Sequence, residues 1–217
     1  MFLNPRSDLT LSPMFPLNMV VFPGSMFNLR IFEHRYLKMV NDCVEMNAEF
    51  GVCLIEKGHE VGGGDERYQY GTLSTILEVS NIGSGQLLIR CVGEKRLRVI
   101  KWHSSQIYPQ AFIEISEVED SGSITSEHLK KMRLILDRTS RNLSELTGHE
   151  IHKIPPSADT TIETIYHLAE HSYLGPYDRY QLLAAQTLED RFALLDELLN
   201  GIDEIYANEL RVQKESK

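Results

Sequence analysis

Short apolar segments separated by turn residues dominate the first half of the chain. Residues 11–17, 25–32 and 50–55 each form such a segment, and residues 70–79 are rich in β-branched and aromatic side chains. Proline, glycine and asparagine lie between the segments. Apolar runs of this length, bounded by turn residues, are typical of β-strands. The pattern therefore predicts a strand in each of the four segments.

One segment in this half departs from the strand pattern and repeats with helical spacing. Within residues 33–47 the apolar side chains that recur in this way are Tyr36, Leu37, Val40 and Val44. The polar side chains on the other side are His34, Arg35, Lys38, Asp42 and Glu45. An apolar stripe opposite a polar face predicts an amphipathic helix.

Further strands are predicted up to residue 118. Residues 81–85 contain two glycines and predict a hairpin turn. Strands are expected at 86–92 and 96–102, separated by a turn or a bulge at Gly93-Glu94, and again at 111–118. Six or seven short strands with turns between them, plus one helix, suggest a closed or nearly closed β-barrel.

The period changes after a polar stretch at 119–125, and the second half predicts a helical bundle. The first expected helix is about 127–146, with Ser126 as N-cap and Gly148 as terminator. A second starts after Ser157 or Asp159, and a short third covers 178–185. The last is capped by Thr187, and its tail is expected to fray from Asn208. The chain is thus expected to be an α+β protein. Its predicted parts are a β-barrel at 1–118, a linker at 119–125 and a helical bundle at 126–217.

Charge narrows the classes of function. The formal net charge is −9, whereas proteins that bind a phosphate backbone usually carry a basic stripe. The one basic cluster in the sequence lies between Arg90 and Lys101, where Arg96 and Arg98 alternate with apolar neighbours. This alternation predicts one solvated strand face, and nucleic-acid binding is therefore disfavoured.

Cysteine usage and hydropathy predict a cytoplasmic protein without membrane association. Cys43, Cys53 and Cys91 are widely spaced and odd in number, and the last two lie in apolar surroundings. Buried thiols in a reducing compartment fit this pattern better than a disulfide framework. The sequence shows neither a signal peptide at its start nor an apolar span of 18 residues.

The sequence carries no recognisable catalytic or cofactor motif. It lacks G-x-S-x-G, a Ser-Lys dyad pattern and the nucleotide-binding G-x-x-x-x-G-K-[ST]. His167 and His171 could share a helix face, but Leu168 stands where an H-E-x-x-H motif requires glutamate, so solvated histidines are favoured over a metal pair. Residues 62–65, Gly-Gly-Gly-Asp, lead into β-forming residues and are expected to be a strand connection. No cofactor, metal or enzymatic activity is predicted.

Several short motifs follow one another in a fixed order. They are Phe15-Pro-Leu-x-x-Val-Val-Phe-Pro-Gly24, Leu29-x-Ile-Phe-Glu-x-Arg-Tyr36, Phe50-Gly-Val, Tyr70-Gly-Thr-Leu73 with Ile76, Val92-Gly-Glu-x-Arg96, Tyr180-Gln181-Leu-Leu183, and Leu188-Glu-Asp-Arg191 with Leu194 and Leu198. In this order and spacing the chain resembles the N-terminal substrate-binding domain of the ATP-dependent Lon proteases. The resemblance covers nearly the whole chain.

The resemblance implies a PUA-like β-barrel followed by a helical bundle, the region of Lon that helps to engage protein substrates. The chain ends at Lys217 without the ATPase module or the Ser-Lys protease module of Lon. We therefore expect a stand-alone, non-catalytic protein-binding module, such as an adaptor or regulator in protein quality control. An RNA-binding PUA-like domain and a hydrolase with an unrecognised site are the alternatives.

A polypeptide-binding surface is expected on apolar patches of the barrel and at the start of the 33–47 helix. The candidate contact residues are Met26, His34, Arg35, Lys38 and Asp42. For the four on the helix, a solvated face is the plainer interpretation. The sequence leaves open the identity of the partner and the oligomeric state.

Overall fold

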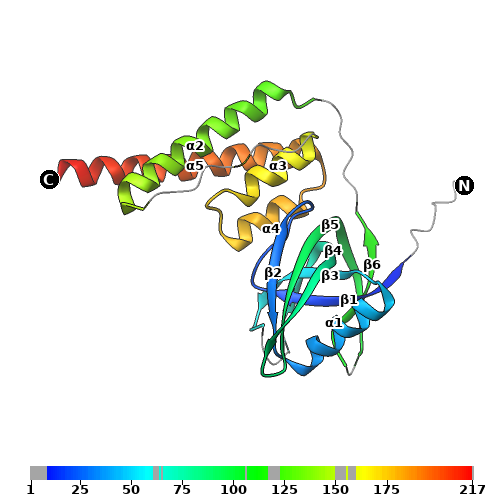
Figure 1. The fold of residues 1–217 in the computed structure, drawn as a ribbon. Coiled ribbons are helices and arrows are strands. Elements are labelled where there is room, and N and C mark those ends of the chain that lie inside the picture. Colours follow the sequence, from blue (N-terminus) through cyan, green and yellow to red (C-terminus); the bar gives the residue numbers. More distant parts are fainter. Residues whose placement is uncertain are drawn as a thin grey trace, which may run out of the picture. The chain divides into compact units, whose positions relative to one another are not determined.

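The computed structural model describes residues 9–60, 64, 66–105, 107–116, 123–149, 155 and 160–216. The chain divides into two compact units, Met1–Glu117 (unit 1) and Val118–Lys217 (unit 2) (Figure 1). Among the described residues, unit 1 contains β1 (Thr10–Leu17), β2 (Met26–Ile31), α1 (His34–Met46), β3 (Phe50–Lys57), β4 (Glu66–Gly83), β5 (Gln86–His103) and β6 (Gln110–Ile115). Unit 2 contains α2 (Ser126–Thr147), α3 (Thr161–Glu170), α4 (Pro176–Ala184) and α5 (Leu188–Glu215). The predicted α+β class is confirmed, while most of the predicted linker, 119–122, lies outside the described residues.

Five strands of unit 1 close into a ring. Their order is β5-β4-β3-β1-β6, and β6 pairs back onto β5. The β1–β3 pair is parallel and the other pairs in the ring are antiparallel. β5 is long enough to pair with β2 along its first half and with β6 along its second. The closure agrees with the predicted β-barrel.

β5 is one continuous strand that includes both segments predicted at 86–92 and 96–102, and of the turn or bulge predicted between them the bulge is confirmed. The interruption at Gly93-Glu94 is a bulge: Leu73 pairs with Lys95 and Ser74 with Gly93, which leaves Glu94 as the extra residue. The segment before β2 is bound at this point, where the Gly24 amide donates to the Gly93 carbonyl at 2.8 Å. The bulge bends the strand without ending it. Hydrophobic periodicity alone could not distinguish such a bulge from a turn.

The core of unit 1 lies on both sides of β1 and β3. Inside the ring, side chains from all five strands form one cluster: Met14, Cys53, Leu73, Leu97, Val99, Ala111 and Ile113. The second cluster lies under α1, where the Phe15 and Tyr36 rings stack with centroids 3.9 Å apart. β1 and β3 are therefore buried on two faces, which explains their continuous apolar runs.

All three cysteines are free and buried, so the burial predicted for Cys53 and Cys91 is confirmed. Burial raises the pKa of Cys43 to about 11 and that of Cys91 to about 12. These thiols therefore pack as small apolar groups.

α1 presents a different stripe to the core from the one predicted. Its buried residues are Tyr36, Met39, Val40 and Cys43. Val44 was expected in the stripe but is 54% exposed. Positions spaced by three, four and seven residues share one helix face. The four buried residues have this spacing from Tyr36, whereas Val44 lies eight residues from it.

The basic cluster on β5 is only partly a solvated strand face, since Arg90, Lys95 and Lys101 are exposed but Arg96 is not. Arg96 is only 5% exposed, and its guanidinium lies over the Tyr70 ring at 4.4 Å from the centroid. Arg98 is half-buried and pairs with Glu114 at 3.5 Å. The prediction of a solvated face was wrong for Arg96, because a neighbouring aromatic ring gives the buried cation a favourable contact.

Unit 2 uses threonine to start three of its four described helices. Thr125 caps α2, where Ser126 was expected, since the Thr125 side chain accepts from the His128 amide and the His128 ring accepts from the Thr125 amide. Thr160 caps α3 in the same reciprocal way with Glu163, whereas Ser157 and Asp159 lie outside the described residues. Gly148 at φ +70° ends α2, and Thr187 caps α5, as predicted.

The tail predicted to fray from Asn208 is helical, because α5 continues to Glu215. Leu210 in this part is buried, and Lys214 pairs with Glu145 of α2 at 2.8 Å. Ile205, which precedes this part of the helix, is exposed. Contacts with α2 thus extend the helix beyond the point where its own composition would sustain it.

Two arginines, one buried and one partly buried, hold helix ends in unit 2. Arg191 of α5 is 0% exposed and donates from Nε to the Leu182 carbonyl and from Nη2 to the Ala185 carbonyl, both at 2.7 Å. Arg179 of α4 bonds in the same manner to carbonyls that follow α3, including that of Ser172 at 3.1 Å. Both side chains satisfy carbonyls that a helix end leaves without a partner.

Candidate functional site

Two pockets lie on either side of Ala48 and Glu49, the residues that connect α1 to β3. The first, which we call the Leu11 pocket, measures about 310 Å³ and is lined by Thr10, Leu11, Ser12, Pro13, Ala48, Glu49, Leu73, Lys95, Ile113 and Ile115. The second, the Val44 pocket, measures about 470 Å³ and is lined by Cys43, Val44, Asn47, Ala48, Glu49, Thr75 and Ile76. Since Ala48 and Glu49 line both, we call the two pockets together the Glu49 site.

The Leu11 pocket exists because β1 begins earlier than its partner β3. The β1–β3 register starts with Met14 opposite Gly51, one residue into β3. Thr10 to Pro13 therefore pair only with β6, on the opposite side. The space that a further stretch of β3 would fill is the pocket, and one edge of β1 faces it.

Apolar and polar side chains share the lining of the Leu11 pocket. Leu73 and Ile113 are buried members of the barrel core, whereas Leu11 and Ile115 are exposed. Lys95 brings a positive charge to this pocket, and Glu49 a negative one. A pocket of this kind suits an apolar side chain flanked by polar or charged groups.

The Val44 pocket lies between the end of α1 and the part of β4 that β3 no longer covers. α1 ends at Asn47, whose left-handed backbone (φ +48°) turns the chain toward Ala48. Across the pocket, Thr75 and Ile76 follow the last β3–β4 pair, which joins Phe50 to Ser74. Glu49 is the one charged residue among the described residues that line this pocket.

The open edge of β4 continues away from the Val44 pocket. From Thr75 to Gly83 the described partners of β4 all belong to β5, on one side of the strand. Leu77, Val79 and Ile82 along this stretch are 51%, 40% and 45% exposed. Natural proteins usually protect such edges with charge, proline or a covering element, so an apolar open edge suggests a binding surface.

The polar face of α1, predicted as a contact surface, is largely paired within unit 1. Arg35 bonds to the Glu33 carboxylate at 3.0 Å and to the Glu60 carbonyl at 3.1 Å. Asp42 accepts hydrogen bonds from Lys38 and, at 3.1 Å, from the Tyr108 hydroxyl.

These contacts move the pKa values on the α1 face in opposite directions. The hydrogen bond from Lys38 holds the pKa of Asp42 below its usual value, and the same bond raises the pKa of Lys38. Burial, with the bond to Asp42, raises the pKa of Tyr108 to about 12. Lys38 and His34 remain exposed and could contact a partner.

Met26 lies on the other side of the β2–β5 pair from α1. On β2 the buried residues Phe27, Leu29 and Ile31 face the core under α1, and Met26 alternates with them on the outer face at 49% exposed. The structure therefore divides the predicted contact residues into two separate surfaces. None of the five lines either pocket of the Glu49 site.

Sequence reasoning missed the residues of the Glu49 site. Ala48 and Glu49 were treated as part of a connection, and Leu11 and Ile115 as ordinary strand positions. One signal was available: the β-forming run at 70–79 extends well past any length that the run at 50–55 could pair with. Unequal partners of this kind leave an open strand edge.

The paired histidines of α3 bind backbone groups. The His167 and His171 rings lie 4.3 Å apart between centroids, with His167 Nε2 3.0 Å from the Pro155 carbonyl and His171 Nδ1 2.9 Å from the His167 carbonyl. Within the described part of the chain, no group of three His, Cys, Asp or Glu side chains is placed to hold a metal ion. The glycine-rich stretch 62–65 lies outside the described residues apart from Gly64. The helices that the structure describes include none that is both long and apolar enough to cross a bilayer.

Comparison with known proteins gives one consistent result. Residues 12–201 match the family model of the ATP-dependent protease La (LON) substrate-binding domain. Lon protease 2 of Desulfotalea psychrophila is 24% identical over 190 residues, covering 86% of this chain and 24% of that protein. A LON peptidase N-terminal domain and RING finger protein of Schizosaccharomyces pombe is 25% identical over 114 residues, covering 47% of this chain and 23% of its own length.

Solved structures agree with the family match. The crystal structure of a Lon N-terminal domain protein from Xanthomonas campestris superposes with a TM-score of 0.65 at 26% identity, covering 88% of this chain and 98% of that one. The chain thus matches a whole solved domain, but it spans only about a quarter of the length of the two curated relatives.

Proposed function

The chain belongs to the Lon substrate-binding domain family, and we propose that it recognises protein by binding polypeptide at the Glu49 site. The observation that carries this proposal is the Leu11 pocket, where exposed Leu11 and Ile115 surround a cavity next to an open strand edge. Unfolded polypeptide offers both of the groups that such a site can bind, namely apolar side chains and free backbone amides.

The size of the site favours weak and adaptable binding. Burying one large apolar side chain contributes about 1.5–3 kcal/mol, and ordering a flexible segment offsets part of that gain. Two adjoining pockets can hold only a short segment of a client. We therefore expect dissociation constants on the order of micromolar, which suits a module that samples many clients.

We propose a non-catalytic role, as an adaptor or regulator in protein quality control. The Ser12 hydroxyl lines the Glu49 site with Glu49 and Lys95, and in the described part of the chain it donates to the Pro13 carbonyl and is not hydrogen-bonded to a base. The three buried free thiols support a reducing compartment such as the cytoplasm. Peptidase activity is named for the longer relatives, of which this chain covers only a part.

The polar face of α1 is a second proposed contact region. His34 and Lys38 are exposed on it, while Arg35 and Asp42 are fixed by the contacts described above. An acidic segment of a client could approach Lys38 without breaking a buried contact. Replacing Lys38→Gln should then weaken binding of acidic unfolded polypeptides by about threefold and leave neutral ones unchanged, as expected for an exposed ion pair.

Fluorescence anisotropy with a permanently unfolded, carboxymethylated polypeptide tests the main proposal. Ile115→Glu and Leu11→Glu should each weaken binding by about tenfold, because each removes an apolar contact and places a carboxylate where an apolar side chain of the client would be buried. Leu134→Glu is the matched control, since Leu134 of α2 is the more exposed side chain at 67% and lies in unit 2. Equal affinity of all four proteins, or no binding at about 50 μM, would reject the proposal.

A further inference from the structure

We propose that the Glu49 site takes its client as an added β-strand on the open edge of β4, with a lysine or arginine of the client in the Val44 pocket. This inference rests on the proposed function and deepens it by naming the type of segment that binds. Three features of unit 1 support it: the edge, its apolar side chains and the charge of the pocket.

The edge determines the backbone conformation of the client. β3 pairs with β4 only up to Ser74, and β5 occupies the other side of β4 from Thr75 to Gly83. In an antiparallel sheet, alternate residues direct their N–H and C=O groups to each side, so this stretch presents a row of donors and acceptors to the β3 side. Only an extended backbone can match such a row, as when a peptide adds a strand to a sheet.

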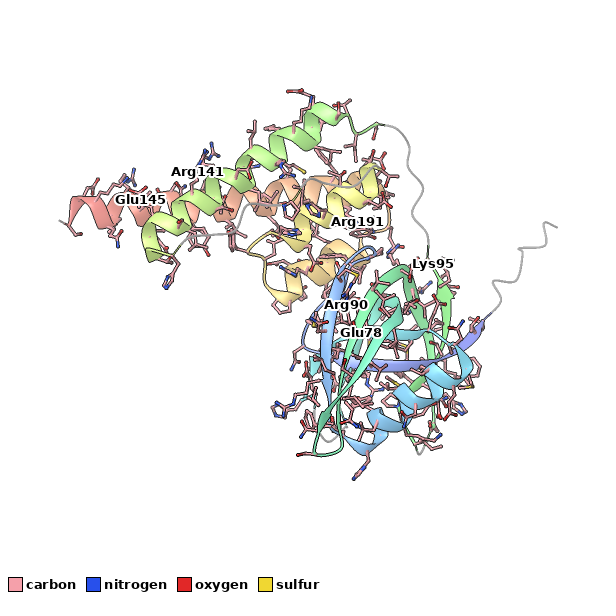
Figure 2. All side chains as sticks on the ribbon, viewed as in Figure 1. Glu78, Arg90, Lys95, Arg141, Glu145 and Arg191 are labelled. Carbon is pink, nitrogen blue, oxygen red and sulfur yellow. The ribbon has the colours of Figure 1, made fainter. Side chains whose placement is uncertain are left out.

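The exposed side chains on β4 determine what flanks that backbone. Leu77 is the extra residue of a bulge, since Ile76 pairs with Cys91 and Glu78 with Arg90. Leu77 is also the most exposed of the three apolar residues on this edge, at 51%. Glu78 lies opposite Arg90 (Figure 2), which partly balances its charge. An added strand with apolar side chains would cover Leu77 and Val79.

The charge around the Val44 pocket favours a cation. Glu49 lies in its lining, and the last turn of α1 carries Glu45 and no basic residue. The carbonyls at a helix C-terminus add a partial negative charge, which basic side chains ordinarily offset. A lysine or arginine of the client would supply the positive charge that this end of α1 lacks.

The same charges argue against a second copy of this chain as the occupant. The segment from Thr75 to Gly83 has the sequence TILEVSNIG, which contains Glu78 and neither lysine nor arginine. Two such edges paired with each other would place no cation in either Val44 pocket. Charge complementarity therefore points to a client segment that combines apolar residues with a basic one.

Three synthetic peptides test the proposal on the full chain. The first is a short, labelled, β-forming peptide of alternating valine and threonine with one central lysine. The second has glutamine in place of the lysine, and the third carries N-methyl groups on alternate residues, which remove the amide donors facing β4. Both changes should weaken binding by about tenfold, one through loss of a charged contact and the other through loss of backbone hydrogen bonds.

A protein variant connects the lysine to the pocket. Glu49→Gln should weaken binding of the lysine peptide by about five- to tenfold and remove the preference for lysine over glutamine. The control is Glu56→Gln, since Glu56 is an exposed acid of β3 that does not line either pocket. Amide hydrogen exchange should show new protection at residues 75–82 when the lysine peptide binds.

The outcomes separate this inference from the proposed function. If carboxymethylated polypeptide binds but the three peptides bind equally well, the added strand is wrong and polypeptide binding stands. A concentration-dependent dimer that the lysine peptide cannot dissociate would show that a second copy occupies the edge, which also overturns the inference. Failure of every polypeptide to bind would reject both.

Discussion

Phe50 pairs with Ser74, and that pair is the last one through which β3 covers β4. On the other side of β3, Met14 and Gly51 start the pairing with β1. β1 and β4 both extend beyond these positions, so the start of β3 leaves an open edge on each neighbour. Ala48 and Glu49, which lead into β3, lie between the two openings and line both pockets. The candidate site is thus a consequence of where one strand begins.

Gly71→Ala should strongly destabilise unit 1. A Cβ at this position would lie 2.2 Å from the Val52 carbonyl oxygen, which is backbone and cannot move without disturbing the β3–β4 pairing. We expect a loss of about 3 kcal/mol. The chain has one tryptophan, Trp102 of β5, so its fluorescence during urea unfolding reports on unit 1.

Gly201→Ala is the matched control for this substitution. Gly201 lies in α5 with nothing within 4 Å of its added Cβ. Alanine should stabilise unit 2 by about 0.5–1 kcal/mol, since it restricts the unfolded chain and favours the helix. If Gly71→Ala left the fluorescence transition unchanged, the close approach of β4 to β3 would be refuted.

The close backbone contacts at two glycines explain why the sequence motifs predicted the fold well. Gly71 and Gly93 belong to the motifs that suggested the family, and both are places where another backbone segment approaches too closely for a Cβ. The strands, α1 and the helical second half followed from periodicity and turn residues. The burial of Arg96 and the length of α5 did not, because each depends on a contact with a distant segment.

Arg191→Met should destabilise unit 2. The substitution keeps an apolar stem but removes the donors to Leu182 and Ala185, leaving buried carbonyls without them. We expect the free energy of unfolding of unit 2 to fall by about 3 kcal/mol. Circular dichroism at a helix-sensitive wavelength would measure this change during unfolding. Arg141→Met on the exposed surface of α2 should change stability by less than about 0.5 kcal/mol (Figure 2). Similar effects of the two substitutions would contradict the capping role of Arg191.

The stability of unit 2 should fall as the solution becomes acidic, in part through His167. Burial lowers the pKa of His167 below 6.5, and the neighbouring His171 and Arg133 act in the same direction, while the Pro155 carbonyl and Glu170 oppose them. Above pH 6.5 the residue is neutral in both states. Below pH 6.5 the unfolded chain takes up the proton before the folded chain does. The free energy of unfolding therefore falls as the pH falls from 6.5 to the lowered pKa of the folded state.

His167→Gln should reduce this pH dependence. Glutamine can still donate to the Pro155 carbonyl but does not titrate, so thermal midpoints of variant and wild type should converge at acidic pH. The control is His34→Gln, which replaces an exposed histidine of unit 1. A wild-type protein whose unit 2 lost no more stability on acidification than His167→Gln would disprove this role.

The site was harder to predict than the fold for a physical reason. Met26, His34 and Lys38 are exposed as a contact surface requires, but Met26 lies on the opposite side of the β2–β5 pair from the other two. The Glu49 site brings together β1, α1, β4, β5 and β6 in space, and its pockets arise from where strands end. Periodicity identifies which residues share a face of one element, but strand ends are set by pairing with other segments.

Amide hydrogen exchange of the full chain, with and without saturating carboxymethylated polypeptide, tests the location of binding most directly. We predict slower exchange at Thr10–Ser12, Ala48–Glu49 and residues 75–82, where backbone groups flank the two pockets. Exchange in α2 and α5 should not change. Protection confined to the helices of unit 2, with none at these three segments, would contradict polypeptide binding at the Glu49 site.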